Sequence, residues 1–258
     1  MYHGFSLVYD DIMRNIPYRF WFSSVVRIME VSGCSMNSFL DLACGTGNIA
    51  IQAARSDLET WALDISCDML TIAGQKASES ALNIFFIQQD MRKLNLGRSF
   101  DCICCAFDSM NYVLEYSEFQ SLLARIMEHL NSDGVLVFDL VTSREITALA
   151  RNPVISEGDD WFMTMALASR TGKIATIEAN FFLRDDDGRY SRYEEIHPKR
   201  IFSKAEIERA LAYAGASDWI ILPDYRFEET GRSDSRITVA ASCSLAAGTL
   251  RARLLNRV

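Results

Sequence analysis

Short apolar runs alternate with segments of helical periodicity over the first half of the chain. Between the runs, apolar residues recur three and four positions apart, for example across 115–130, as on one face of an amphipathic helix. This alternation predicts a parallel sheet with helices packed against it. The runs that we interpret as strands are Ser38–Ala43, Thr60–Leu63, Asn83–Ile87, Phe100–Cys105 and Gly134–Val141.

The pattern changes after residue 141. Three longer β-type runs, separated by turn residues, predict a three-stranded antiparallel insertion within 160–202. A helix is expected over 204–214, ending at Gly215, and two last strands over 219–222 and 237–243. At the other end, helical spacing over 10–30 is interrupted by Pro17.

Composition narrows the class of protein. The 258 residues are 49% hydrophobic, which excludes general disorder, and no apolar run is long enough to cross a membrane. The net charge of −8 disfavours nucleic acid as a partner. No leader is visible at the start, and seven cysteines without a C-x-x-C pair indicate reduced thiols, so a cytoplasmic location is expected. The three histidines show no metal-ligand spacing, and no metal is expected.

The most informative segment is the glycine loop Asp41-Leu-Ala-Cys-Gly-Thr-Gly-Asn48, which joins a predicted strand to a predicted helix. Glycine lets the backbone approach a ligand closely, and a helix N-terminus offers free N–H groups. The spacing Gly45-x-Gly47-x-x-Ala50, with Asp64 nineteen residues after Gly45, fits a dinucleotide site. A simple tight turn is the other interpretation.

Asp41 distinguishes the ligands that this loop could hold. A carboxylate before the glycines would repel a diphosphate, whereas it would attract a ligand that carries an ammonium and a sulfonium. The stretch Phe39-Leu-Asp-Leu-Ala-Cys-Gly-Thr-Gly47 resembles the first motif of class I S-adenosylmethionine-dependent methyltransferases, which usually have glycine where Ala43 stands.

Further residues match that family in order over about 1–141, and more loosely over 203–243. The resemblance implies a Rossmann-like seven-stranded, mostly parallel sheet and S-adenosylmethionine as cofactor. It implies that Asp64 binds the ribose hydroxyls of the cofactor. It also implies that Met69 and the pair Asp90-Met91 contact the adenine. Phe107 would lie under the cofactor. The complete set of expected cofactor-binding residues is Asp41, Gly45, Gly47, Asp64, Met69, Asp90, Met91, Phe107 and Trp21.

The acceptor is expected to be a small molecule, methylated on N or O by in-line displacement. The segment after Phe107 lacks the Asn/Asp-Pro-Pro-aromatic element of enzymes that methylate base or glutamine amino groups, and it lacks a Pro-Cys pair. Two other classes stay open: an NAD-dependent oxidoreductase, and a methyltransferase-fold protein that binds without turnover.

The aromatic N-terminal segment resembles the lid of the small-molecule subgroup that includes amino-sugar N,N-dimethyltransferases. The pairs Tyr9-Asp10 and Tyr18-x-x-Trp21 stand at the matching places. Methyl transfer needs a general base only if the acceptor arrives protonated, and the two candidates for a catalytic role are Tyr9 and His197. Alternation places Glu195 and His197 on one strand face, either over the acceptor or exposed to solvent.

These patterns suggest four regions. Residues 1–36 form the helical lid, and 37–141 with 203–245 form the cofactor-binding domain. Residues 142–202 form the antiparallel insertion, on the substrate side or at an oligomer contact. Residues 246–258 form a tail without recognisable chemistry. A homodimer is left open.

Overall fold

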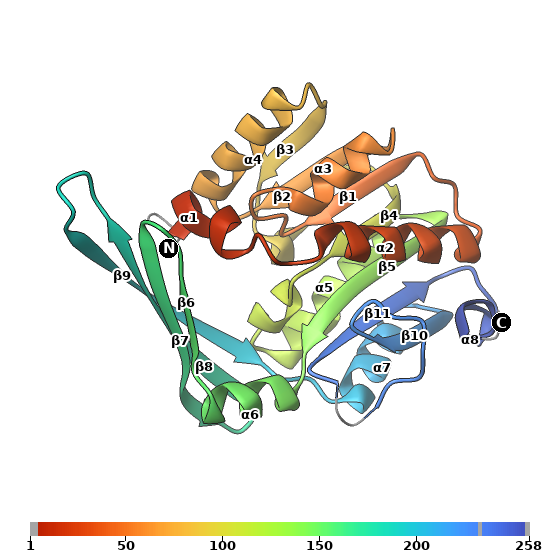
Figure 1. Ribbon diagram of the computed structural model, residues 1–258. Coiled ribbons are helices and arrows are strands. Elements are labelled where there is room, and N and C mark those ends of the chain that lie inside the picture. The colour runs from red at the N-terminus through yellow and green to blue at the C-terminus, as the bar shows by residue number, and fades with distance from the viewer. Residues whose placement is uncertain (1–4, 232–233, 256–258) are drawn as a thin grey trace.

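A seven-stranded sheet forms the centre of the computed structural model, which describes residues 5–231 and 234–255 (Figure 1). Its strand order is β10-β11-β5-β4-β1-β2-β3, and only β11 runs antiparallel to its neighbours. The predicted mostly parallel sheet is therefore confirmed. The strands are β1 (Ser38–Leu42), β2 (Glu59–Asp64), β3 (Ile84–Gln88), β4 (Phe100–Cys105), β5 (Leu130–Val141), β10 (Asp218–Pro223) and β11 (Arg236–Ser242).

Helices cover both faces of this sheet because each central strand is apolar on both sides. One face packs against α2 (Tyr18–Ser32), α3 (Asn48–Arg55) and α8 (Thr249–Leu255). The opposite face packs against α5 (Tyr116–Glu128) and α7 (Lys204–Tyr213). Next to β2 and β3 lies α4 (Cys67–Glu79), and short 3-10 turns η1 (Met91–Lys93) and η2 (Ser109–Tyr112) follow β3 and β4.

Local sequence signals account for several element ends. Pro17 precedes α2, as the interrupted periodicity predicts. Ser203 and Glu206 form a capping box that starts α7, with the Ser203 hydroxyl accepting from the Glu206 N–H. After α7 the chain turns at Gly215, whose φ of 86° lies in the left-handed region, as predicted for the end of this helix.

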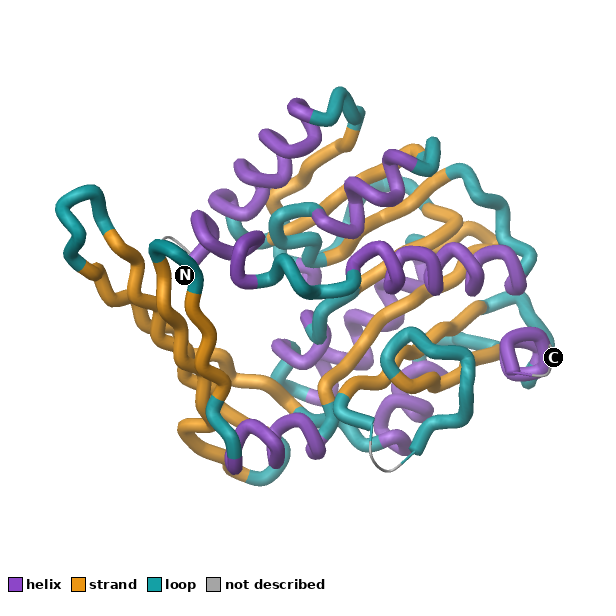
Figure 2. Tube along the Cα trace, in the orientation of Figure 1, coloured by secondary structure: helices purple, strands orange, loops and turns teal. Residues whose placement is uncertain are grey.

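The insertion has four antiparallel strands rather than the predicted three, in the order β6-β7-β8-β9. The missed strand, β6 (Val154–Glu157), is a four-residue edge strand without clear alternation of buried and exposed positions. It follows the helix α6 (Ser143–Arg151), which the sequence patterns also missed. The predicted runs correspond to β7 (Trp161–Thr171), β8 (Ile174–Arg184) and β9 (Tyr190–Arg200). Figure 2 shows this second sheet set to one side of the main sheet.

The predicted N-terminal lid divides into two parts with different surroundings. Helix α2 belongs to the core, because Val25, Ile28 and Met29 are fully buried against the main sheet. Helix α1 (Phe5–Ile12) instead lies between α4 and the second sheet (Figure 1). Tyr2, which opens the aromatic segment, lies outside the described residues.

The predicted tail also takes part in the core. Leu250 and Leu254 of α8 are buried in the cluster that includes α2, and the Arg253 guanidinium donates to the Val31 carbonyl. The apolar spacing of this short helix could have indicated a buried face. In the described part of the chain, no helix combines the length and apolarity that a membrane crossing requires.

Candidate active site

The glycine loop lies where the strand order of the main sheet reverses. From β1 the chain proceeds outward to β2 and β3, and it returns to the other side of β1 with β4 and β5. The carboxyl ends of strands at such a switch point form a crevice in α/β sheets. The sheet topology therefore places the loop at the expected ligand site.

Both loop glycines have left-handed backbones, with φ of 54° at Gly45 and 77° at Gly47. A Cβ on Gly47 would lie 3.0 Å from the Ala73 Cβ of α4, whereas a Cβ on Gly45 would meet no atom within 4 Å. Gly47 is thus required for close packing of the loop on α4, and Gly45 leaves the space above the loop open. Helix α3 begins directly after Gly47, which as a glycine has no side chain to cap it.

Asp41 is buried beneath the glycine loop, where its carboxylate contacts the start of α3. Its carboxylate is 2% exposed, and its Oδ2 accepts a hydrogen bond from the Ala50 N–H at 2.8 Å. Burial raises the pKa of Asp41 to about 7, although the Ala50 N–H lowers it. The charge that we expected to select a cationic ligand is therefore partly neutralised near pH 7, and the observed contact of the carboxylate is with α3. Direct contact with a cofactor stays a prediction.

Asp64 ends β2 beside the loop. Its two carboxylate oxygens accept from the Gly45 and Ser66 N–H groups, both at 2.8 Å, so it fixes the loop to the start of α4. Burial raises its pKa. Each carboxylate oxygen keeps a second lone pair that could accept from a ligand hydroxyl.

Asp90 and Met91, the expected adenine-binding pair, follow β3 at the same edge. The Asp90 carboxylate is held by Arg92 at 2.6 Å, and this guanidinium lowers its pKa. Met91 lies at the margin of the core beneath α5. Met69, by contrast, is buried among Trp161, Met163 and Phe181 of the second sheet. The structure therefore brings Asp90 to the crevice and places Met69 against the insertion.

Helix α1 is attached to the glycine loop through Asp10. The Asp10 carboxylate accepts from Thr46 Oγ1 at 2.7 Å, from Asn48 Nδ2 at 2.9 Å and from Lys76 Nζ at 2.6 Å. Although burial opposes it, these donors lower the pKa of Asp10. Tyr9, next in the helix, is thereby brought over the crevice near Tyr18, and its burial raises its pKa well above 10. It is therefore a protonated phenol at neutral pH.

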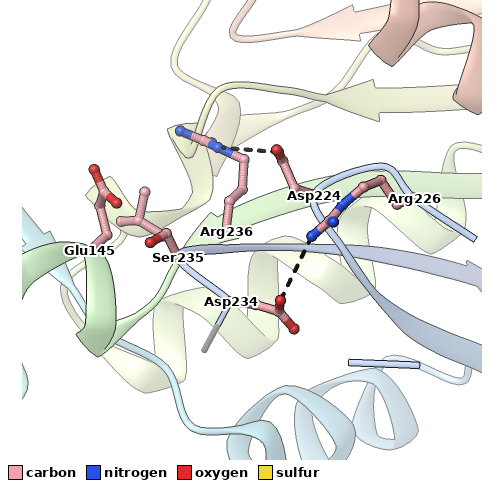
Figure 3. A pocket seen from close by; sticks show the side chains of 7 residues that line it. Glu145, Asp224, Arg226, Asp234, Ser235 and Arg236 are labelled. Atoms are coloured by element: carbon pink, nitrogen blue, oxygen red, sulfur yellow. Dashed lines mark ion pairs between the residues drawn. The ribbon is translucent and has the colours of Figure 1, made fainter. Parts of the chain in front are cut away.

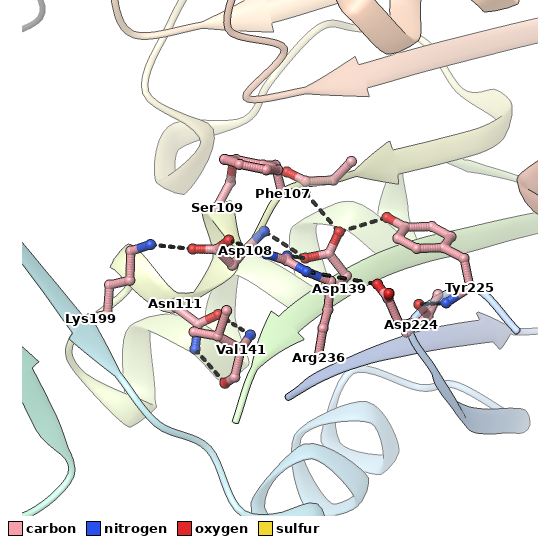
Figure 4. Close-up of polar contacts among 12 residues, drawn as sticks. Phe107, Asp108, Ser109, Asn111, Asp139, Val141, Lys199, Asp224, Tyr225 and Arg236 are labelled. Atoms are coloured by element: carbon pink, nitrogen blue, oxygen red, sulfur yellow. Dashed lines mark hydrogen bonds and ion pairs between the residues drawn. The ribbon is translucent and has the colours of Figure 1, made fainter. Parts of the chain in front are cut away.

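Beyond β4 the backbone takes a strained path. Phe107 and Asp108 both have positive φ, of 61° and 50°, which is uncommon for residues other than glycine. The Asp139 carboxylate stabilises this turn, because it accepts from the Phe107 N–H at 2.7 Å and the Asp108 N–H at 2.6 Å (Figure 4). Trp21 packs beside Phe107, with ring centroids 5.9 Å apart, and stacks on Tyr225.

Asp108 and Asp139 are neutralised by two cations. Arg236 binds both carboxylates, and Lys199 of β9 binds Asp108 (Figure 4). Although burial opposes it, these cations lower the pKa of Asp108. Two negative and two positive side chains thus pair in one cluster, which Tyr225 completes by donating its hydroxyl to Asp139, while a third carboxylate, Asp224, lies 3.9 Å from Arg236 at its margin. We call this set the ion cluster.

Asn111 joins the insertion to this region. Its Oδ1 accepts from the Val141 N–H at 3.0 Å, and its Nδ2 donates to the Arg200 carbonyl at 2.7 Å. Val141 ends β5 and Arg200 ends β9, so one carboxamide ties together the two points at which the chain leaves and re-enters the main sheet.

A polar hollow of about 330 Å³ opens next to the ion cluster (Figure 3). It lies at the carboxyl end of β5, and Arg236 connects it with the cluster. A second hollow, near Asp57 and Asn83, lies at the opposite edge of the sheet, away from the loop. The residues that line the first are Val141, Glu145, Asp224, Arg226, Asp234, Ser235 and Arg236.

Glu195 and His197 are buried, not solvent-exposed, with 8% of each residue accessible. His197 contacts Glu195 and the hydroxyl of Tyr112, a residue of η2. Glu195 and His197 therefore share a face as alternation predicts, and Tyr112 is a neighbour that the sequence patterns did not indicate. The structure also reveals Lys76, Asp139, Lys199, Tyr225 and Arg236. Asp139 alone carried a signal, as a charged residue within the apolar run of β5.

The chain matches known proteins along most of its length. A family model described as a methyltransferase domain matches residues 39–134. A "Putative methyltransferase" of Geobacillus sp. (strain WCH70) is 30% identical over 243 residues, covering 93% of this chain and 98% of its own. The dTDP-3-amino-3,6-dideoxy-α-D-glucopyranose N,N-dimethyltransferase of Streptomyces fradiae is 30% identical over 182 residues, 70% of each chain.

Solved structures agree with these matches. An S-adenosylmethionine-dependent methyltransferase from Clostridium acetobutylicum ATCC 824 superposes with a TM-score of 0.83 at 26% identity, covering 93% of this chain and 98% of its own. The sugar N-methyltransferase KedS8 from Streptoalloteichus sp. ATCC 53650 gives a TM-score of 0.72 at 25% identity, with 89% and 90% covered.

Proposed function

Because the chain belongs to the S-adenosylmethionine-dependent methyltransferases, we propose that it transfers the methyl group of this cofactor to nitrogen or oxygen of a small-molecule acceptor. The observation that carries the proposal is that two groups of candidate site residues lie on either side of one crevice, at the carboxyl ends of the strands. Asp64 and the glycine loop lie on one side of the crevice, and Phe107 with the ion cluster lies on the other. Helix α1 bridges them, since Asp10 binds the loop while Tyr9 approaches Asp108.

The residues present fit the cofactor. S-Adenosylmethionine supplies an electrophilic methyl group on a sulfonium, which a nucleophile displaces in line. Asp64 would accept from ribose hydroxyls, and Asp90 would accept from the adenine amine. Trp21 Nε1 is a buried donor with no hydrogen-bond partner among residues 5–231 and 234–255, and we assign it to the amino-acid end of the cofactor.

The residues on the acceptor side of the crevice favour a small-molecule acceptor. The ion cluster and the adjoining hollow offer polar groups in a confined space, and an excess of 34 acidic over 26 basic residues does not suit nucleic acid. The Streptomyces fradiae relative is named for an amino-sugar nucleotide. We therefore take dTDP-3-amino-3,6-dideoxy-α-D-glucopyranose as the first acceptor probe. The chain's contribution would be alignment and exclusion of water by α1.

Isothermal titration of the folded chain with S-adenosylhomocysteine tests the cofactor assignment. We expect saturable heat at micromolar ligand, and none with NADH under the same conditions. Heat from NADH alone would favour an oxidoreductase and reject the proposal. Binding of S-adenosylhomocysteine without transfer to any of a panel of amines and hydroxyl compounds would favour a non-catalytic binding protein.

Asp64→Asn is expected to weaken S-adenosylhomocysteine binding by about 1.5–3 kcal/mol, the range for hydrogen bonds to a charged acceptor. The substitution keeps the shape of the side chain and one acceptor oxygen, which can still hold the Gly45 N–H. The matched control is Asp57→Asn at the opposite edge of the sheet, which should leave the affinity unchanged. Equal affinities in the two variants would show that the ribose lies elsewhere.

A further inference from the structure

Strand β9 presents a polar row on its inner face. Glu195, His197 and Lys199 alternate along the strand, so their side chains point the same way. Their partners on β8 are small or apolar, Ala179, Ile177 and Ala175, and all three are buried. A row of ionisable groups on a buried apolar face is costly unless the groups serve one another or a ligand.

His197 makes two directed contacts. Its Nδ1 lies 3.0 Å from the Tyr112 hydroxyl, and its Nε2 lies 3.2 Å from Glu195 Oε2. An imidazole between a hydroxyl and a carboxylate is the arrangement by which serine hydrolases move a proton. The Nε2–Oε2 contact has the distance of an ion pair but lacks hydrogen-bond geometry. The nearby carboxylate nevertheless favours the tautomer with its proton on Nε2, which leaves Nδ1 as an acceptor for the Tyr112 O–H.

Tyr112 lies beside the ion cluster. It is half-buried and lies five residues after Phe107, on the turn that the ion cluster holds. The Lys199 ammonium, paired with Asp108, lies 5.1 Å from the centre of its ring, and Tyr9 approaches it from α1. Within residues 5–231 and 234–255, the ionisable groups around the Tyr112–His197 contact include Glu195, Lys199, Asp108 and Tyr9.

We propose that Tyr112, His197 and Glu195 form a proton relay that deprotonates an aliphatic ammonium acceptor before methyl transfer. The inference rests on the proposed function and narrows its acceptor to an amine. Tyr112 is the catalytic residue, because its oxygen would touch the acceptor. His197 and Glu195 act through it as positioning residues.

The proton balance of the relay is simple. One N–H bond of the ammonium breaks and its proton bonds to the Tyr112 oxygen, while the original Tyr112 proton moves to His197 Nδ1. His197 becomes an imidazolium, which the Glu195 carboxylate stabilises, and the amine regains its lone pair. An imidazole, with an ordinary pKa of about 6.5, can accept from an ammonium at neutral pH far more readily than from an alcohol. This difference favours an amine over a hydroxyl acceptor.

The first test measures the tautomer of His197 by ¹⁵N multiple-bond NMR on histidine-labelled protein, without any substrate. The chain has only three histidines, so His197→Gln assigns the signal. We expect a neutral imidazole protonated on Nε2 at pH 9, and a displaced Nδ1 signal in Tyr112→Phe. Protonation on Nδ1 instead, or an imidazolium that persists at pH 9, would overturn the relay.

The second test measures methylation of the amino-sugar nucleotide probe against pH. His197→Gln should lower kcat on the order of 10²-fold near pH 7, with a smaller deficit as rising pH deprotonates the amine. S-Adenosylhomocysteine affinity should be unchanged, and His129→Gln, at the far end of α5, should match wild type. A deficit constant across pH would mean a structural role and overturn the proposal. If wild type methylates neither this probe nor the panel of amines and hydroxyl compounds, the proposed function fails. The tautomer of His197 measured by NMR then shows by itself whether the relay exists.

Discussion

Arg236→Met is expected to lower the free energy of unfolding by about 3–5 kcal/mol, the cost of leaving buried charges without their partner. Asp139 is 0% exposed and Asp108 is 3% exposed, and Arg236 binds both. Methionine fills a similar volume, so the loss would come from the charge and its hydrogen bonds rather than from a cavity. Urea unfolding followed by circular dichroism measures the change.

The matched control for this substitution is Arg251→Met. Arg251 pairs with Glu229 on the surface, where an ion pair contributes about 0–1 kcal/mol, so the control should unfold close to wild type. Adding Asp139→Asn to Arg236→Met should recover part of the loss, because it removes one of the orphaned charges. A loss below about 1 kcal/mol in the single variant would contradict the ion cluster as described.

The free energy of unfolding of wild type should fall relative to that of Asp41→Asn as the pH rises from about 4 to 7. Burial raises the pKa of Asp41 from 3.8 to about 7, so over this interval the folded state holds a proton that the unfolded state has released. The contribution of the protonated Asp41 carboxyl to the free energy of unfolding is fully present below about pH 4 and is lost as the pH approaches 7. The relative change is on the order of 4 kcal/mol, from about 1.4 kcal/mol for each unit of pKa.

Unfolding midpoints at pH 4, 5.5 and 7 measure this effect. Asparagine keeps an oxygen that can accept from the Ala50 N–H, so Asp41→Asn isolates the titration from the loss of that hydrogen bond. Asp186→Asn, in the exposed turn between β8 and β9, should follow wild type at every pH. If wild type and Asp41→Asn keep a constant difference over the interval, the buried carboxyl does not titrate there.

Local patterns were sufficient for most of the fold. The strands β1 to β5 and helices α3 to α5 each carry a complete periodic signal, and the glycine loop identified the crevice. The pattern was insufficient for β6, because a four-residue edge strand pairs on one side only and needs no alternation. Its place in the sheet is set by pairing with β7, which sequence periodicity cannot express.

The functional side chains divide in the same way. Asp64 and Asp90 stand at or just after strand ends, so their place at the crevice could be predicted from the sequence, while their contacts with a cofactor stay predictions. The ion cluster joins residues far apart in sequence, such as Asp108 and Arg236, and no local signal encodes their contact. Met69 shows the converse. The family resemblance implies an adenine contact for this residue, and that contact stays a prediction. Its burial against the insertion carried no signal in the sequence.

The Asn111 bridge has a consequence for how this architecture can diversify. Because the insertion departs from Val141 and returns at Arg200 beside a single side chain, its strands can lengthen, shorten or change residues without shifting the register of β5 or the entry into α7. Under the proposed function, the insertion carries the relay residues of β9 and forms an exchangeable module on the acceptor side. The donor-binding half can stay constant while the module is replaced.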